Sequence, residues 1–257
     1  MIDIVPRHQL GYMVPVLVSD AIHHQFYQLM PSNCAFVCKP LDLKSFTREG
    51  ALGAIDAFWP AFDFLVERGV DRISQGGIPV SAPVGRRRIL TLLEEAARRS
   101  SIPTSADFEE AIDALRALGV RRVAVAAKWD DALMRAVSDY LADAGIETVG
   151  LTSEPHSASE VIAVRPRDGV DLALNLGRTA FRDAPKADGL LLAGGAWLSL
   201  QAVPQLEQEF GRPVVTNPSA TFWAALRQFG EKGRMPGWGR LIDGLPAVPQ
   251  DAKAPAK

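Results

Sequence analysis

Short apolar runs alternate with longer amphipathic segments along most of the chain, and this alternation is the main structural signal in the sequence. The runs have the length of buried β-strands, whereas the segments between them carry the hydrophobic period of helices. Strands are predicted at 10–14, 34–39, 70–74, 122–127, 147–151, 189–192 and 214–215. Strands that alternate with helices predict parallel βαβ units with right-handed crossovers.

Capping and stop signals place the helices between these strands. Helices are predicted at 20–29, 47–68, 86–100, 105–118, 130–144 and from about 198 onward. The segment 78–85 contains two prolines and is predicted to be a loop that forms a wall over a site.

The order of elements divides the chain into two similar halves, although no sequence repeat relates them. Residues 1–105 with 216–243 form the first half, residues 106–215 form the second, and 244–257 form a flexible polar tail. The predicted fold is α/β, with two pseudo-symmetric α/β sandwich halves that each contain a parallel sheet. A cleft is expected between the carboxyl edges of the two sheets.

Two glycine pairs follow predicted strands and precede predicted helices. They are Gly76-Gly77 and Gly194-Gly195. Glycine lets the backbone approach a ligand and leaves amide N–H groups free to face an anion. The pairs therefore predict two facing half-sites; the alternative is that each is an ordinary βα turn.

Composition excludes several classes of partner and cofactor. The 257 residues carry a net charge of −2 without a basic stripe, so we expect no nucleic acid partner. The absence of a long apolar run and of an export signal predicts no membrane association and a cytoplasmic location. No nucleotide-binding glycine motif is present, so the sequence gives no support for nucleotide binding. Composition leaves open whether the protein is a monomer or a homo-oligomer.

Cysteine and histidine spacing does not predict a metal site. Cys34 and Cys38 fall on one face of a predicted strand, too far apart to form a disulfide, and no further ligands lie near them. His23 and His24 are adjacent, so they point in different directions on a helix. We interpret the two cysteines as small buried hydrophobic residues.

Several segments resemble the arylmalonate decarboxylase family of bacteria. The resemblance covers nearly the whole chain and is strongest in 115–124, 188–207, 211–223 and 236–243. This family belongs to the aspartate/glutamate racemase superfamily, which includes maleate isomerases. The resemblance implies the two-sandwich fold and a cofactor-independent enzyme that handles small carboxylates through cysteines at strand ends.

The sequence departs from the family pattern at the cysteines themselves. The cysteine that protonates the enediolate in the decarboxylases falls on Gly194, and the other cysteine of the racemases falls on Gly76. The hydroxyl donors of the first turn correspond to Gly77 and Ile78. Because glycine has no side chain that could transfer a proton, the cysteine mechanism is excluded.

Other family positions also differ. The tyrosine at the end of the central strand falls on Lys128 or Trp129, and an asparagine of the maleate isomerases falls near Leu17 or Val18. These comparisons place the substrate site at the strand ends. The predicted substrate-binding residues are Pro15, Val16, Gly76, Gly77, Ile78, Trp129, Gly194, Gly195, Thr216 and Asn217.

Two side chains are candidates for the missing acid. Lys128 ends a buried strand, where a desolvated lysine can act as base, nucleophile or carboxylate anchor; the alternative is a solvated lysine beside Asp130 and Asp131. His156 lies in a loop after a strand and has a side chain that titrates near neutral pH. We predict Lys128 and His156 as catalytic residues.

These observations predict a cofactor-independent lyase that decarboxylates a small arylmalonate-type or dicarboxylate substrate with a proton donor other than cysteine. One alternative is an isomerase, racemase or hydrolase of a small carboxylate on the same fold. Another is a catalytically inactive protein that binds small carboxylates. Fold resemblance alone does not decide between them.

Overall fold

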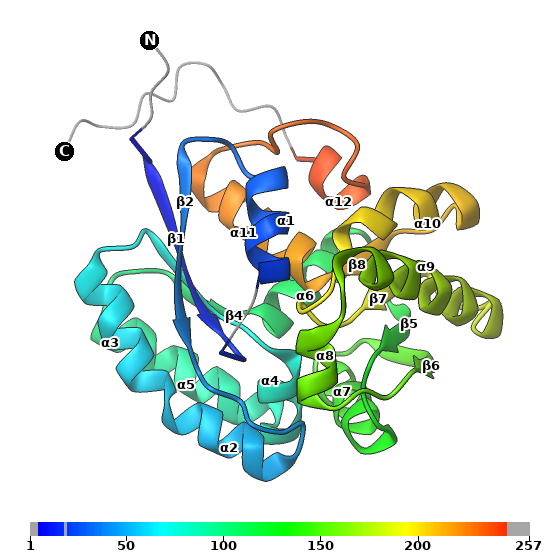
Figure 1. Ribbon diagram of the computed structural model, residues 1–257, viewed down its shortest axis with the longest axis horizontal. Helices are drawn as coiled ribbons and strands as arrows, with labels where there is room; N and C mark the ends of the chain where they lie inside the picture. The colour runs from blue at the N-terminus through cyan, green and yellow to red at the C-terminus, as the bar shows by residue number, and fades with distance from the viewer. Residues whose placement is uncertain (1–4, 18–19, 246–257) are drawn as a thin grey trace.

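Two four-stranded parallel sheets form the framework of the protein in the computed structural model, which describes residues 5–17 and 20–245. The first sheet has the order β2-β1-β3-β4 and the second the order β6-β5-β7-β8. The strands are β1 (His8–Val14), β2 (Cys34–Pro40), β3 (Arg72–Gln75), β4 (Thr104–Ala106), β5 (Arg122–Ala127), β6 (Glu147–Ser153), β7 (Gly189–Leu192) and β8 (Val214–Thr216). The two sheets share one strand order, which confirms the predicted α/β fold with two pseudo-symmetric halves (Figure 1).

Helices connect the strands and bury the apolar residues of both sheets. They are α1 (Asp20–Leu29), α2 (Arg48–Asp56), α3 (Phe58–Arg68), α4 (Ile78–Val84), α5 (Arg86–Arg99), α6 (Asp107–Ala117), α7 (Asp131–Asp143), α8 (Ala158–Ala163), α9 (Pro166–Asp183), α10 (Val203–Phe210), α11 (Asn217–Phe229) and α12 (Arg240–Asp243). In the described part of the chain, no helix is both long and apolar enough to cross a membrane.

Two helix pairs join the halves. Helix α6, which follows the last strand of the first sheet, packs against α11, which follows the last strand of the second. Helix α4 of the first half packs against α7 of the second. Figure 1 shows α6 near the middle of the molecule, with β1 and β2 on one side and β5 to β8 on the other.

Three predicted elements differ from the structure for identifiable reasons. The predicted loop at 78–85 is wrong, because 78–84 form α4; Pro79 occupies its first turn, where a missing N–H costs nothing. The predicted single helix at 47–68 is two helices that meet at Ala57. Strand β4 was predicted as part of a helix because its three residues form no apolar run.

Other boundaries agree closely or fall outside the described residues. Strands β5 and β7 have the bounds predicted for them. Helices α8 and α9 were not predicted. Both cysteines are free and lie on β2. Val18 and all but the first two residues of the predicted 244–257 tail lie outside the described part.

Candidate functional site

A cavity opens at the carboxyl ends of both sheets, where parallel α/β folds commonly bind ligands. It encloses about 540 Å³, part of which is open to solvent at the mouth. Its lining comes from the ends of β1, β3, β5 and β7, the starts of α4 and α6, helices α1 and α8, and neighbouring loops: Tyr12, Pro15, Val16, Ile22, Leu43, Phe46, Gly77, Ile78, Pro79, Asp107, Lys128, Trp129, Val161, Gly194, Gly195 and Ala196. Most of these residues are apolar. The polar exceptions include the hydroxyl group of Tyr12, the carboxyl group of Asp107 and the amino group of Lys128.

Lys128 places a buried amine in this cavity. The residue follows β5 directly and is 1% exposed. Its Nζ lies 3.7 Å from the centroid of the Trp197 ring and has no hydrogen-bond partner among the described residues. Burial holds the pKa of Lys128 well below its usual value, so the neutral amine is favoured. The face of Trp197 attracts an ammonium and offsets part of this effect.

The burial of Lys128 decides between the two interpretations of this residue. A solvated lysine beside Asp130 and Asp131 is wrong. Asp130 instead caps α7, since its Oδ1 accepts a hydrogen bond from the backbone N–H of Leu133 at 2.9 Å. Lys128 therefore points away from these carboxylates and into the interior.

Asp107 brings a buried carboxyl group to the same cavity. Its Oδ2 accepts hydrogen bonds from the Gly77 N–H at 2.7 Å, from Asn217 Nδ2 at 2.9 Å and from the Tyr12 hydroxyl at 3.4 Å. Its Oδ1 is buried without a partner among the described residues. Burial raises the pKa of Asp107 to about 7, against the opposing effect of the bonds from Gly77 and Asn217. The group can therefore exchange a proton near neutral pH.

Asp107 and Asn217 connect the two glycine turns, and we call this pair the Asp107–Asn217 clamp. Asp107 accepts from the N–H of Gly77 in the first turn, and Asn217 Oδ1 accepts from the N–H of Gly194 in the second at 2.7 Å. Asn217 Nδ2 joins the two side chains by donating to Asp107. Trp197 Nε1 also donates to the Gly194 carbonyl at 2.7 Å. The backbone on both sides of the cavity is thus fixed by side chains at the starts of α6 and α11.

The two glycine turns differ in the space they leave for a side chain. A Cβ at Gly76 would lie 2.3 Å from the Cζ and hydroxyl oxygen of Tyr12, so the tyrosine ring occupies that space. A Cβ at Gly194 would meet only Trp129 at 3.4 Å, Trp197 at 3.7 Å and Lys128 Nζ at 4.0 Å. The second turn therefore has room for a side chain, and Lys128 ends beside that room.

The structure brings most of the predicted site residues together. The eight that line the cavity are Pro15, Val16, Gly77, Ile78, Lys128, Trp129, Gly194 and Gly195. Leu17, near which the family's asparagine falls, is 62% exposed and does not line it.

Four predicted residues do not line the cavity. Gly76 lies under the Tyr12 ring, and Thr216 caps α11 by accepting from the Ser219 N–H. Asn217 acts through the clamp. The His156 imidazole lies 2.8 Å from the Glu154 carbonyl, and its backbone N–H donates to the Lys128 carbonyl. His156 therefore supports the backbone of Lys128 and does not present its ring to the cavity.

Sequence reasoning missed Asp107 and Tyr12. A usable signal for Asp107 was its position, since Asp107 and Asn217 each begin the helix that follows the last strand of a sheet. Tyr12 carries no such signal, because it is one of several apolar residues on β1.

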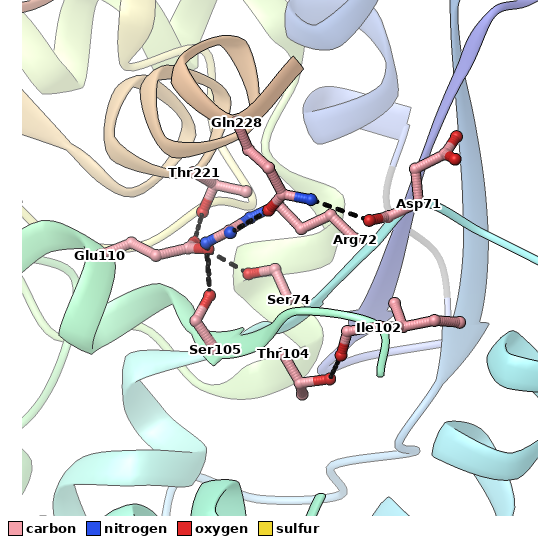
Figure 2. Close-up of polar contacts among 9 residues, drawn as sticks. All are labelled: Asp71, Arg72, Ser74, Ile102, Thr104, Ser105, Glu110, Thr221 and Gln228. Atoms are coloured by element: carbon pink, nitrogen blue, oxygen red, sulfur yellow. Dashed lines mark hydrogen bonds and ion pairs between the residues drawn. The ribbon is translucent and has the colours of Figure 1, made fainter. Parts of the chain in front are cut away.

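A second buried polar network supports α6 behind the cavity. Glu110 accepts from Arg72 Nη2 at 2.7 Å, from the Ser74 hydroxyl at 2.8 Å and from the Thr221 hydroxyl at 2.7 Å (Figure 2). Ser105 also donates to Glu110. These contacts tie β3, β4, α6 and α11 together, and the Glu110 charge adds to the rise in the pKa of Asp107. The described residues contain no cluster of three or more side chains suited to a metal ion.

Comparison with known proteins points to one family. The family model for arylmalonate decarboxylase matches residues 10–242. The arylmalonate decarboxylase of Bordetella bronchiseptica is 32% identical over 210 residues, which cover 81% of this chain and 86% of that protein. A crystal structure of arylmalonate decarboxylase in the liganded form, with one glycine changed to cysteine and one cysteine to serine, has a TM-score of 0.84 and 31% identity. That match covers 93% of this chain and all of the other. The maleate isomerase of Geobacillus stearothermophilus is 27% identical over 135 residues, about half of each chain.

Proposed function

Because the chain belongs to the arylmalonate decarboxylase family, we propose that it removes carbon dioxide from a small malonate-type dicarboxylate and protonates the resulting carbanion with Lys128. The observation that carries this proposal is the position of the Lys128 amine. It is buried, has no hydrogen-bond acceptor among the described residues, and lies 4.0 Å from the point where a side chain at position 194 would begin. A cysteine at position 194 would occupy the same region of the cavity.

The proposed reaction needs a proton for the α-carbon and a group that can accept the negative charge left when carbon dioxide departs. The bond between the α-carbon and one carboxylate breaks, carbon dioxide leaves, and the electron pair spreads into the remaining carboxylate as an enediolate. The Lys128 ammonium then donates a proton to the α-carbon and becomes the neutral amine. Solvent returns the proton to Lys128 after the product leaves, so each turnover consumes one proton.

Substrate binding would favour the protonated form of Lys128, with the proton taken from solvent. Burial by itself favours the neutral amine. A dicarboxylate bound beside it places negative charge within reach of Nζ, which raises the pKa of a lysine and favours the ammonium. Asp107 does not repel the dicarboxylate while its carboxyl group is protonated. Its pKa of about 7 keeps a large fraction of the Asp107 carboxyl groups protonated at neutral pH.

The lining of the cavity fits a substrate with an apolar or aromatic substituent. Phe46 and Trp129 form an edge-to-face pair with ring centroids 6.5 Å apart, and Leu43 and Val161 complete an apolar wall. Aromatic rings pack favourably against such walls. An aryl group would lie there while the carboxylates face Lys128.

An isomerase or racemase reaction on the same fold is the second candidate, and the maleate isomerase relatives favour it. A binding protein without turnover is a third candidate, since no cysteine is present at position 194 or 76. We also propose that the protein acts in the cytoplasm as a monomer or homo-oligomer without nucleic acid or membrane partners. The net charge of −2 supports the absence of a nucleic acid partner.

Incubation with phenylmalonate and methylmalonate in D₂O tests these candidates together. Decarboxylation predicts release of carbon dioxide and one deuterium at the α-carbon of the product. Incubation with maleate under the same conditions tests isomerisation by the formation of fumarate. Saturable thermal stabilisation by malonates without turnover would instead show a binding protein and refute the decarboxylase proposal.

Variants of two lysines assign the proton donor. Lys128→Met removes the buried amine and is expected to lower the decarboxylation rate by on the order of 100-fold or more. Lys186→Met removes an exposed amine and is expected to leave the rate unchanged. A Lys128→Met protein that folds normally and decarboxylates at the original rate would exclude Lys128 as the donor.

A further inference from the structure

Lys128 has the surroundings of a nucleophile as well as those of an acid. We propose that its amine forms an imine with the ketone of small 3-oxo carboxylates, and that the protein decarboxylates these compounds through a covalent enamine. This activity goes beyond the decarboxylation of malonates proposed above, although it uses the same cavity. No amine-containing or metal cofactor is required, because the lysine itself supplies the electron sink.

The contacts of Lys128 leave its nitrogen lone pair available. A surface lysine such as Lys44, whose Nζ lies 2.6 Å from Oδ1 of Asp42, forms an ion pair with that carboxylate. Lys128 has no carboxylate and no hydrogen-bond acceptor among the described residues, and its Nζ lies over the face of Trp197. Lys128 lines the cavity, and its Nζ lies 4.0 Å from the point where a side chain at position 194 would begin. Desolvation in an apolar pocket is one of the established ways to activate a lysine for imine formation.

The direction of the Lys128 pKa agrees with this geometry, since burial favours the neutral amine that attacks a carbonyl. Imine formation also needs an acid to expel water from the carbinolamine. Asp107 lines the same cavity, its Oδ1 has no partner among the described residues, and burial raises its pKa to about 7. The cavity therefore contains an amine whose neutral form is favoured by burial and a carboxyl group able to give and take a proton near neutral pH.

The bonds and protons of the cycle balance as follows. The Lys128 nitrogen adds to the ketone carbon to give a carbinolamine, which takes up a proton and loses water to give a protonated imine. The bond to the carboxylate then breaks, carbon dioxide leaves, and the electron pair moves through the α-carbon to the imine nitrogen, which gives a neutral enamine. A proton adds to the α-carbon and restores the protonated imine. Water hydrolyses this imine to the ketone and free lysine, and the cycle consumes one proton in total.

The charge of the substrate separates the two activities. A malonate carries two carboxylates, which favour the ammonium form of Lys128 and therefore acid catalysis. A 3-oxo monocarboxylate carries one negative charge and places a ketone beside the nitrogen. The compounds expected to form the imine are thus small 3-oxo acids with one carboxylate, of which acetoacetate is the simplest.

Reductive trapping on the full-length protein tests the inference. The protein is incubated with acetoacetate and sodium cyanoborohydride, digested, and analysed by peptide mass spectrometry, while acetone release is measured in a parallel sample without reductant. The expected result is an N-isopropyl group on Lys128, because reduction after decarboxylation leaves the carbon skeleton of acetone on the nitrogen. Acetone release is expected to exceed the buffer rate by on the order of 100-fold.

Matched variants make the result specific. Lys128→Arg keeps a cationic side chain but has no amine that forms an imine, so the adduct and acetone release should both be lost. Lys186→Met should retain both. Absence of an adduct at Lys128, equal labelling of Lys186, or an adduct without faster acetone release would overturn the inference.

Phenylmalonate turnover, measured on the same preparation, distinguishes this inference from the proposed function. Turnover of phenylmalonate without an acetoacetate adduct overturns the imine and leaves the malonate decarboxylase intact. An adduct with acetone release but no phenylmalonate turnover supports the imine and refutes the proposed function.

Discussion

Replacement of Asp107 by asparagine is expected to stabilise the folded protein at neutral and alkaline pH, although the residue lies in the centre of the site. The asparagine carbonyl oxygen can replace Oδ2 and accept the same hydrogen bonds from Gly77, Asn217 and Tyr12. Asparagine cannot ionise. The substitution therefore removes the cost of placing a negative charge in the interior and keeps the contacts.

The magnitude follows from the pKa of Asp107, which burial raises from its ordinary value of 3.8 to about 7. A raised pKa means that the folded state holds the proton more tightly than the unfolded state. This contribution to stability is fully present below about pH 4 and is lost as the pH rises to about 7. At about 1.4 kcal/mol per pKa unit, the loss is about 4 kcal/mol. The asparagine variant does not undergo this loss.

Urea unfolding of both proteins at several pH values measures the effect. The stability advantage of Asp107→Asn should grow by about 3 kcal/mol between about pH 5 and about pH 8. Asp188→Asn is the matched control. Hydrogen bonds from Arg122 hold the pKa of Asp188 at about 2, so its protonation does not change over this range and its effect on stability should be constant. An Asp107→Asn variant whose advantage stays constant from pH 5 to pH 8 would refute the reasoning.

Three further substitutions test other contacts of the site. Gly76→Ala places a Cβ against the Tyr12 ring and should lower the free energy of unfolding by about 1–3 kcal/mol in urea. Arg72→Met leaves the Glu110 charge buried without its partner and should cost about 3–5 kcal/mol in the same assay. Gly194→Cys should fold with a penalty of about 1–3 kcal/mol, because φ is +108° there, and should raise the rate of carbon dioxide release from phenylmalonate.

Each of these substitutions has a control or a contradicting result. Gly53→Ala is the control for Gly76→Ala. A Cβ at Gly53 meets nothing within 4 Å on the exposed side of α2, so this change should raise the free energy of unfolding by about 0.5–1 kcal/mol. Arg99→Met removes an exposed ion pair and should cost less than about 1 kcal/mol. Equal losses for Arg72→Met and Arg99→Met would show that burial of the Glu110 pair is unimportant. A folded Gly194→Cys protein with an unchanged rate would show that a thiol at that point does not reach the substrate.

The sequence predicted those elements whose character is set by their own residues. Strands β5 and β7 are buried on both faces and therefore consist almost entirely of apolar residues, which identifies them directly. Strand β4 consists of Thr104, Ser105 and Ala106, and it is a strand because it pairs with β3. Helix α4 was hidden by its prolines. Such elements depend on neighbours that are distant in the sequence, so local patterns cannot reveal them.

The site residues divide in the same way, into those visible in the local sequence and those that depend on distant parts of the chain. The turns at Gly77 and Gly194 were predictable because a glycine after a buried strand is visible in the sequence. The sequence left open whether Lys128 is buried or solvated, because its burial depends on Trp197, which is contributed by the loop after a different strand. The importance of Asp107 was also not visible, because an aspartate at the start of a helix is common and acquires its raised pKa only from burial in the assembled fold.

The unequal chemistry of the Asp107–Asn217 clamp explains how two equivalent positions can hold two turns together. Two aspartates facing each other in a buried site would repel, so one would have to be protonated. The Asp–Asn pair avoids this, because the amide of Asn217 donates to Asp107 and its carbonyl accepts from the Gly194 N–H. Asp107 Oδ2 also accepts a hydrogen bond from the Gly77 N–H, whereas its Oδ1 has no partner in the part of the chain that the structure describes. The clamp thus fixes both glycine turns while leaving one carboxyl oxygen free for chemistry, which a symmetric pair of amides could not provide.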